Sequence, residues 1–302
     1  MRPDFPKSII DFQEWFSTEE SCEEYLLNSR WPDGFECPIC GDTEFYYIST
    51  RRVLKCRANS HYTYLTAGTV MHGTRLPLRL WFWAAYLLTT ETTGISALQL
   101  QRQLKIKRYE VAYTVLQKLR SSMVNPERTK IKGEIEVDET YIGGPTTGGK
   151  RGRGTEKAIV VVGVEKRGNH AGRVRLRHIE DVGSDTLTEF IRSNIERRST
   201  VVTDEFPSYR GISKYGYRHE IDEDLKLAHL VISNLKTWIK GTFHGVSNKH
   251  LQAYLNEFVF RFNRRRTPMA AFQTILGLAS NVEDWPTYEG LYSGEWIHPN
   301  IP

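Results

Sequence analysis

The stretch that decides the fold of this chain is Gly133-Glu-Ile-Glu-Val-Asp-Glu-Thr-Tyr-Ile-Gly143. It is rich in β-branched and aromatic residues and is bounded by glycines, which predicts a β-strand. Three carboxylates, Glu136, Asp138 and Glu139, lie within it. Taken alone, this pattern fits either an edge strand with a solvated acidic face or a strand that carries catalytic groups.

A second stretch with the same ending favours the catalytic interpretation. Thr200-Val-Val-Thr-Asp204 is a short β-branched run that brings an aspartate to its carboxyl end. In open α/β sheets, ligands bind at the carboxyl ends of the strands. Carboxylate oxygens are the ligands that hard divalent cations prefer. The sequence therefore predicts that Asp138 and Asp204 together hold two catalytic Mg²⁺ or Mn²⁺ ions.

Composition limits the class of protein. The chain has 302 residues, 39% of them hydrophobic, which is enough for two or three small domains with buried cores. No apolar run reaches the roughly 18 to 20 residues of a membrane span, and the acidic N-terminus lacks a signal-peptide pattern. We expect a cytoplasmic, nucleoid-associated protein that does not bind membranes.

The formal charge of +5 is unevenly distributed. Residues 1–44 contain 3 Lys and Arg against 11 Asp and Glu, whereas residues 45–132 contain 15 against 3. A strongly basic segment of globular composition is typical of proteins with a polyanionic partner. The partner we expect is double-stranded DNA.

Three of the four cysteines have metal-ligand spacing. Cys37-Pro-Ile-Cys40-Gly is a knuckle that directs two thiolates at one tetrahedral zinc, and Cys56 and His61 follow. Residues 45–48 and 52–55 predict the two strands of a small ribbon between these ligands. Such a ribbon is too small to fold by apolar burial alone, so we expect structural Zn²⁺ in a Cys₃His site. The alternative is a set of free thiols, which is the role expected for Cys22.

Two short helices are predicted within the basic segment, over residues 95–104 and 108–120. Their short link gives the outline of a helix-turn-helix, whose second helix would present Arg108, Lys118 and Arg120 to DNA. Any antiparallel helix pair has a similar pattern, and the local charge favours DNA contact. A glycine-rich loop further along carries Lys150, Arg151 and Arg153, which we expect to contact the DNA backbone.

The central part of the chain alternates strands and a helix. Residues 158–164 and 173–179 predict two further strands, and Ser184 is predicted to cap a helix over residues 185–195. With the strands that end at Asp138 and Asp204, the order is strand, strand, strand, helix, strand. That is the order of a ribonuclease H-like α/β domain.

Several motifs together resemble the ISXO-like insertion-sequence transposases, over about residues 37–266. Besides the zinc ribbon they are Thr66-Ala-Gly-Thr69 before Leu76-Pro-Leu-Arg-Leu-Trp81, Val137-Asp-Glu-Thr-Tyr-Ile-Gly-Gly144, Gly241-Thr242, His250-Leu-Gln-x-Tyr254 and Phe260-Arg-Phe-Asn-Arg-Arg265. The resemblance implies a zinc ribbon and a DDE, ribonuclease H-like catalytic domain. It also implies metal-dependent cleavage and strand transfer at the ends of a mobile element.

The chain departs from this family at two positions. The family's fourth zinc cysteine corresponds to Asn59, and His61 is the obvious replacement. The family's third catalytic residue is often a glutamate followed seven positions later by a lysine. Here that register is occupied by His229 and Lys236.

The residues around His229 support this register independently. Polar residues at positions 229, 233, 236 and 240 share one helical face, while apolar residues at 231, 235, 238 and 239 share another. A helix with this pattern can pack on a sheet and direct His229 and Lys236 towards the two aspartates. An imidazole ligand favours Mn²⁺ over Mg²⁺. The alternatives are Asn234, Asp224 or Glu223 as the third ligand, or His229 as an ordinary polar residue.

The sequence thus predicts five segments. They are an N-terminal helical segment over 1–34, a zinc ribbon over 35–70, a helical DNA-binding region over 71–124, a catalytic domain over 133–266 and a tail over 267–302. The predicted function is that of a DNA transposase acting on element ends and target DNA as a homo-oligomer. The alternatives are a DNA-binding regulator with an inactive catalytic domain, and a metal-dependent nuclease without strand transfer.

Overall fold

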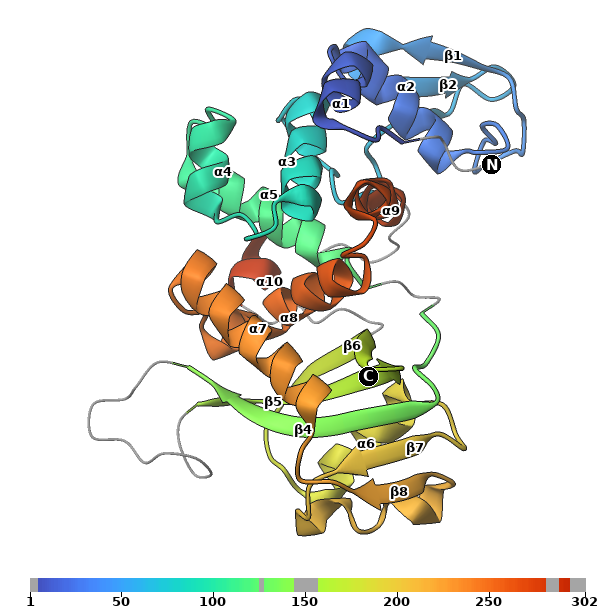
Figure 1. Cartoon of the computed structure of the whole chain (residues 1–302). Coiled ribbons are helices and arrows are strands. Elements are labelled where there is room, and N and C mark those ends of the chain that lie inside the picture. The colour runs from blue at the N-terminus through green and yellow to red at the C-terminus, as the bar shows by residue number, and fades with distance from the viewer. Residues whose placement is uncertain (1–4, 125–127, 144–156, 281–287, 294–302) are drawn as a thin grey trace. The chain divides into compact units, whose positions relative to one another are not determined.

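The computed structural model describes residues 5–124, 128–143, 157–280 and 288–293 (Figure 1). The chain forms two compact units. The first joins residues 1–123 with residues 266–296, and the second consists mainly of residues 124–265. Within the described ranges, no helix has the length and apolar character needed to cross a membrane.

The first unit contains a small three-stranded antiparallel sheet. Its strands are β1 (Phe45–Ile48), β2 (Val53–Cys56) and β3 (Tyr62–Tyr64), in the order β1-β2-β3. The first two strands match the predicted ribbon, and the third was not predicted. One face of this sheet contributes Leu54 and Cys56 to a core shared with Phe35 and Cys37.

The helices of the first unit are α1 (Ile9–Trp15), α2 (Glu19–Arg30), α3 (Leu78–Thr90), α4 (Ala97–Gln103), α5 (Tyr109–Ser121), α9 (Pro268–Ser280) and α10 (Tyr288–Ser293). The apolar spacing near the N-terminus continues through both α1 and α2. The chain nevertheless breaks between them, because the Thr18 side chain accepts the Ser21 N–H and caps α2.

The core of the first unit is aromatic. Phe12 of α1 lies against Trp83 of α3 at a ring-centroid distance of 4.6 Å, and against Phe272 of α9 at 5.3 Å. The helix α3 is buried on more than one face. The segment predicted as a C-terminal tail therefore supplies a core helix to the first unit.

The second unit is built on a five-stranded mixed sheet. Its strands are β4 (Glu134–Ile142), β5 (Ala158–Arg167), β6 (His170–Ile179), β7 (Thr200–Thr203) and β8 (Arg218–Ile221). Their order is β6-β5-β4-β7-β8, with antiparallel pairs from β6 to β4 and parallel pairs from β4 to β8. The sequence did not predict β8, because an exposed edge strand with three polar residues lacks the expected alternation.

Helices cover both faces of this sheet (Figure 1). One face packs against α6 (Ser184–Asn194), and the other packs against α7 (Lys226–Phe243) and α8 (Asn248–Asn263). Gly163 of β5 permits close packing, since a Cβ there would lie 3.4 Å from the Phe190 ring of α6. The predicted cap of α6 was wrong. Gly183 is the N-cap, and the Asp181 carboxylate accepts its N–H at 2.6 Å.

Candidate active site and zinc site

The two aspartates predicted to be catalytic come from neighbouring parallel strands. The β4–β7 pairing places Glu136 opposite Val202, and Asp138 and Asp204 each follow two residues later. Side chains two residues apart in an extended chain point to the same side. Because Val202 packs in the core beneath α7 and α8, both aspartates belong to that face. Asp138 lies in the middle of β4, and Asp204 directly follows β7.

The helix α7 brings the third predicted residue to this place. The Nε2 atom of His229 lies 3.5 Å from Oδ2 of Asp138. Lys236 follows His229 by about two helical turns. Partial burial lowers the pKa of its amine, and the nearby Asp138 carboxylate opposes this lowering. The structure thus brings Asp138, Asp204, His229 and Lys236 to one side of the sheet.

The Asp138 carboxyl has an unusual proton affinity. Burial, and secondly the charge of Glu139, raise its pKa to about 6, and the charge of Asp204 also raises it. The backbone N–H of Glu139, which donates to Oδ1 at 2.8 Å, and the His229 ring oppose this rise. Two carboxylates that disfavour each other, next to an imidazole, are a donor set suited to a divalent cation. These residues offer donor atoms of the right kind for such a metal. Among the described residues, however, the group of ligand atoms that all lie within 4.8 Å of one another is the three cysteines, and not Asp138, Asp204 and His229. The catalytic metal stays a prediction.

This pKa predicts how Asp138→Asn changes stability. The pKa of the Asp138 carboxyl is 3.8 in the unfolded chain and about 6 in the folded protein. The protonated carboxyl therefore contributes fully to the free energy of unfolding below pH 3.8, and this contribution is lost as the pH rises through 6. Without added Mg²⁺ or Mn²⁺, the variant should be more stable than wild type at pH 7, by at most about 3 kcal/mol. Urea unfolding at pH 7 and pH 4 measures this. A variant less stable at pH 7 would contradict the assigned environment.

Three other carboxylates of the second unit, Glu139, Asp224 and Glu257, are engaged with other residues. Glu139 points to the α6 face, where the buried Tyr209 hydroxyl donates to it at 2.9 Å. Asp224, an alternative third ligand, forms a 3.0 Å ion pair with Lys226. Glu257 is fully buried, and its carboxylate lies 3.5 Å from the Arg261 guanidinium.

Glu136 is a functional candidate that the sequence analysis assigned no role. This buried carboxylate accepts the backbone N–H groups of Leu227 and Ala228, both at 2.8 Å. The N-cap residue of α7 is Leu225, whose side chain forms no capping hydrogen bond. Because the first N–H groups of a helix lack partners within the helix, Glu136 fixes the start of α7 on β4. It thereby positions His229 relative to Asp138.

Substitution of Glu136 should therefore affect the reaction through α7. Glu136→Ala leaves two buried N–H groups without an acceptor, at a cost of about 1 to 3 kcal/mol each. We expect cleavage at saturating DNA to fall at least tenfold while the KM for DNA is unchanged, and Glu136→Gln to restore most of the rate. The control is Glu134→Ala on the same strand, whose exposed carboxylate pairs with Lys166 at 2.6 Å. Equal rates for Glu136→Ala and Glu134→Ala would exclude the positioning role.

The ribbon brings three of its predicted zinc ligands together. The sulfur atoms of Cys37, Cys40 and Cys56 all lie within 4.8 Å of one another, and those of Cys40 and Cys56 are 3.6 Å apart. Tetrahedral zinc with Zn–S bonds of about 2.3 Å requires sulfur separations of about 3.8 Å. Burial raises the pKa of Cys37, but the backbone N–H groups of Ile39 and Cys40 outweigh it and bring the pKa to about 7. The cluster therefore fits structural Zn²⁺.

The predicted fourth zinc ligand, His61, lies outside the cysteine cluster. Asn59, at the family's cysteine position, lies with its amide nitrogen 3.7 Å from the Cys37 sulfur. The backbone of His61 is nevertheless tied to the site. Its carbonyl accepts the Cys56 N–H at 2.9 Å, and its N–H donates to Asn59 Oδ1 at 2.9 Å. His61 as the fourth ligand stays a prediction.

The residues predicted to contact DNA differ in their exposure. Arg108 is exposed and forms a 3.4 Å ion pair with Glu110. Lys118 is partly buried, and its amine lies 3.5 Å from the backbone carbonyl of His72. Arg120 is only 1% exposed, so this prediction was wrong, because a buried guanidinium cannot reach a phosphate. The predicted contacts Lys150, Arg151 and Arg153 lie outside the described residues.

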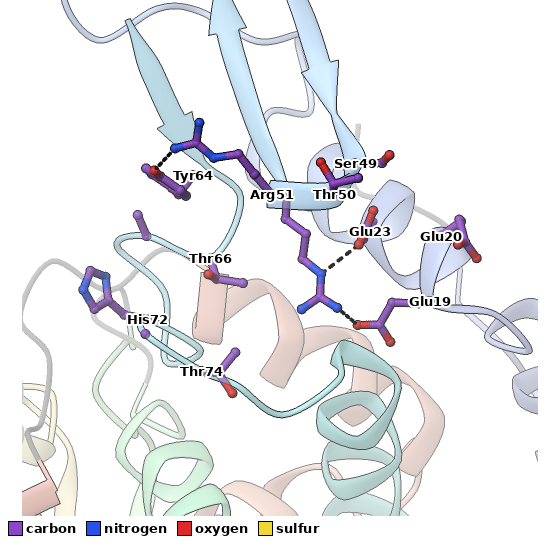
Figure 2. A pocket seen from close by; sticks show the side chains of 13 residues that line it. Glu19, Glu20, Glu23, Ser49, Thr50, Arg51, Tyr64, Thr66, His72 and Thr74 are labelled. Atoms are coloured by element: carbon purple, nitrogen blue, oxygen red, sulfur yellow. Dashed lines mark hydrogen bonds and ion pairs between the residues drawn. The ribbon is translucent and has the colours of Figure 1, made fainter.

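A pocket of about 720 Å³ lies within the first unit (Figure 2). Arg52 binds both Glu19 and Glu23 there, with Nε of Arg52 2.9 Å from Glu23. Glu19 also accepts the N–H of Leu78 at 2.6 Å, at the start of α3. These acidic groups therefore join α2 to the ribbon and to α3, and no predicted catalytic residue lines this pocket.

Comparison with known proteins identifies the class. Residues 17–61 match the transposase zinc-ribbon domain, and residues 130–263 match the ISXO2-like transposase domain. The chain therefore combines two domains of a transposase. The resemblance to the ISXO-like insertion-sequence transposases is confirmed by this combination.

Two individual proteins are also similar. An uncharacterized protein in transposable element ISH50 of Halobacterium salinarum is 24% identical over 299 residues, which cover 87% of this chain and 98% of the relative. The Mos1 transposase paired-end complex with the left transposon end is a solved structure with 13% identity. The match covers 63% of this chain and 78% of that chain at a TM-score of 0.22, which is too low to establish a shared fold.

Proposed function

We propose that this chain is the transposase of an insertion sequence, which cleaves DNA at the element ends and joins the freed 3′-hydroxyl to target DNA. The observation that carries the proposal is the placement of His229 Nε2 3.5 Å from Asp138 Oδ2, beside a carboxyl group whose pKa the charge of Asp204 also raises. The two matched transposase domains support the same conclusion.

The strand arrangement supports a ribonuclease H-like catalytic domain. In the order β6-β5-β4-β7-β8, three strands are antiparallel and the last two run parallel to β4. Asp138 lies in β4 and Asp204 directly follows β7, and these two strands are neighbours in the sheet. This arrangement agrees with the strand order on which the prediction was based, and β8 extends it by one strand.

Each residue has a distinct proposed role. Asp138, Asp204 and His229 would hold divalent Mg²⁺ or Mn²⁺, which when bound activates the attacking oxygen and stabilises the leaving oxygen. Lys236 would contact a DNA phosphate or the negative charge that develops there. Glu136 holds the start of α7. Because two element ends must be joined, we propose that the active protein is a homo-oligomer on double-stranded DNA.

Purified protein and an element-end duplex test this function. The duplex sequence comes from inverted repeats in the DNA that flanks the gene. We expect nicking that requires Mg²⁺ or Mn²⁺ and leaves a 3′-hydroxyl, followed by covalent joining to a second duplex. Specific binding without nicking would instead identify a regulator with an inactive catalytic domain. Nicking without joining would identify a nuclease.

A further inference from the structure

The outer face of the zinc ribbon carries aromatic side chains that folding does not explain. Tyr46, Tyr62 and Tyr64 are 57%, 40% and 43% exposed. The opposite face of the same sheet packs in the ribbon core through Leu54 and Cys56. The hydroxyls of Tyr46 and Tyr62 form no hydrogen bond to a described residue. The three rings are open to solvent, although Val53 on the same face is buried.

The strand register places these side chains in rows. Tyr46 of β1 lies opposite Lys55 of β2, which lies opposite Tyr62 of β3, so the three form one row across the sheet. Tyr64 stands two residues from Tyr62 on the same face. Its hydroxyl accepts a 3.0 Å hydrogen bond from Arg51, and both residues are labelled at the rim of the pocket in Figure 2.

Cations lie over these rings. The Arg57 guanidinium is 4.6 Å from the ring centroid of Tyr46. The Arg51 guanidinium is 5.2 Å from the ring centroid of Tyr62, and the Lys55 amine is 5.8 Å from the same centroid. Arg57 also pairs with Glu44 at 3.0 Å. Among the described residues, no ion pair joins Arg51 or Lys55 to a carboxylate. The face therefore combines π surfaces with two cations, Arg51 and Lys55, that form no ion pair with a described carboxylate.

This combination fits a nucleic acid strand with unpaired bases. Rings on an open sheet can stack on bases, and neighbouring Arg and Lys side chains can pair with the phosphates. The bases of an intact duplex are stacked on each other and cannot use such rings. We refer to Tyr46, Tyr62, Tyr64, Arg51, Lys55 and Arg57 as the tyrosine face.

We propose that the tyrosine face binds single-stranded DNA, by stacking of unpaired bases on the rings and ion pairing of phosphates with the three cations. The proposal rests on the proposed function only in taking DNA as the ligand. Binding is therefore measured on zinc-loaded full-length protein that carries Asp138→Asn, without Mg²⁺ or Mn²⁺. Failure of this proposal is then separate from failure of the cleavage activity.

Affinity for a single strand of about 12 nucleotides is measured by fluorescence anisotropy and compared with the matched duplex. We expect Tyr62→Ala to weaken single-strand binding about tenfold and Tyr62→Phe, which retains a ring, to change it less than threefold. Tyr292→Ala, at an exposed tyrosine outside the ribbon, is the control for ring loss. Lys7→Ala is the control for loss of one exposed charge when Lys55→Ala is tested.

Photochemical cross-linking locates the strand directly on the unsubstituted ribbon. An oligonucleotide with one 5-bromodeoxyuridine should attach to peptides that contain Tyr46, Tyr62 or Tyr64, as identified by mass spectrometry. This readout does not depend on whether Tyr62→Ala keeps its zinc. Cross-links only outside the ribbon, or equal binding by zinc-loaded Tyr62→Ala and Tyr292→Ala proteins, would overturn the proposal. An equal loss of duplex affinity and single-strand affinity in the Tyr62→Ala protein would overturn it as well.

Discussion

Asp138→Asn and Asp204→Asn should each abolish DNA cleavage while leaving DNA binding nearly unchanged. Each substitution removes a carboxylate from the proposed metal site, and neither changes the basic segment over residues 45–132. We expect rates below one hundredth of wild type, a loss of at least about 3 kcal/mol of transition-state stabilisation. A gel assay on labelled element-end duplex measures cleavage, and anisotropy measures binding.

Glu205→Gln is the matched control, because it removes an exposed carboxylate next to Asp204. Its cleavage rate should stay within a factor of three of wild type. If Asp138→Asn or Asp204→Asn protein still cuts at more than one hundredth of the wild-type rate, the two-aspartate assignment is wrong. Since Asp138→Asn is also expected to stabilise the metal-free protein at pH 7, lost activity in that variant cannot be ascribed to unfolding.

Removal of zinc should unfold the ribbon and leave the second unit folded. A structural zinc contributes on the order of 10 to 16 kcal/mol to the folding of a small domain, which exceeds what the core of Phe35, Cys37, Leu54 and Cys56 can supply. We expect chelation or Cys37→Ser to expose about residues 35–63 to rapid hydrogen exchange. Binding to element ends should weaken with it, while exchange in β4 and β5 stays slow.

Zinc retention tests the fourth ligand. His61→Ala should lower zinc affinity at least tenfold, whereas Asn59→Ala should lower it less than threefold, because an amide is a poorer zinc ligand than an imidazole. Zinc content after dialysis against a weak chelator gives the comparison. Equal zinc content in His61→Ala and wild-type protein would remove His61 from the site.

The central strand and its carboxylates could be predicted because the signal is local. Residues 134–142 carry their own alternation, their own glycine boundaries and their own acids. The strand β7 is a β-branched run directly followed by Asp204. The register of α7 was also predictable, since Val231, Leu235 and Ile239 are buried while Lys236 stays exposed on the polar side. In each case the residues that decide the structure lie within one element.

The features that were missed depend on distant partners. Glu136 caps a helix that begins 90 residues later, and no local pattern shows which acid will meet which N–H. The positive charge of Arg120 suggested a contact with DNA, but the packing of α5 in the first unit buries its side chain. The polar strand β8 forms because β7 offers a free edge for pairing. Tertiary packing decided these features, and local propensity could not.

The measurement that tests the central claim most directly compares cleavage by wild-type, His229→Ala and His229→Glu proteins in Mn²⁺ and in Mg²⁺. The claim is that His229 completes the metal site with Asp138 and Asp204. Since imidazole favours Mn²⁺ and a carboxylate favours Mg²⁺, wild type should prefer Mn²⁺ and His229→Glu should shift towards Mg²⁺. His229→Ala should be at least a hundredfold slower in both metals. A fully active His229→Ala protein with an unchanged metal preference would contradict the claim and place the third ligand elsewhere.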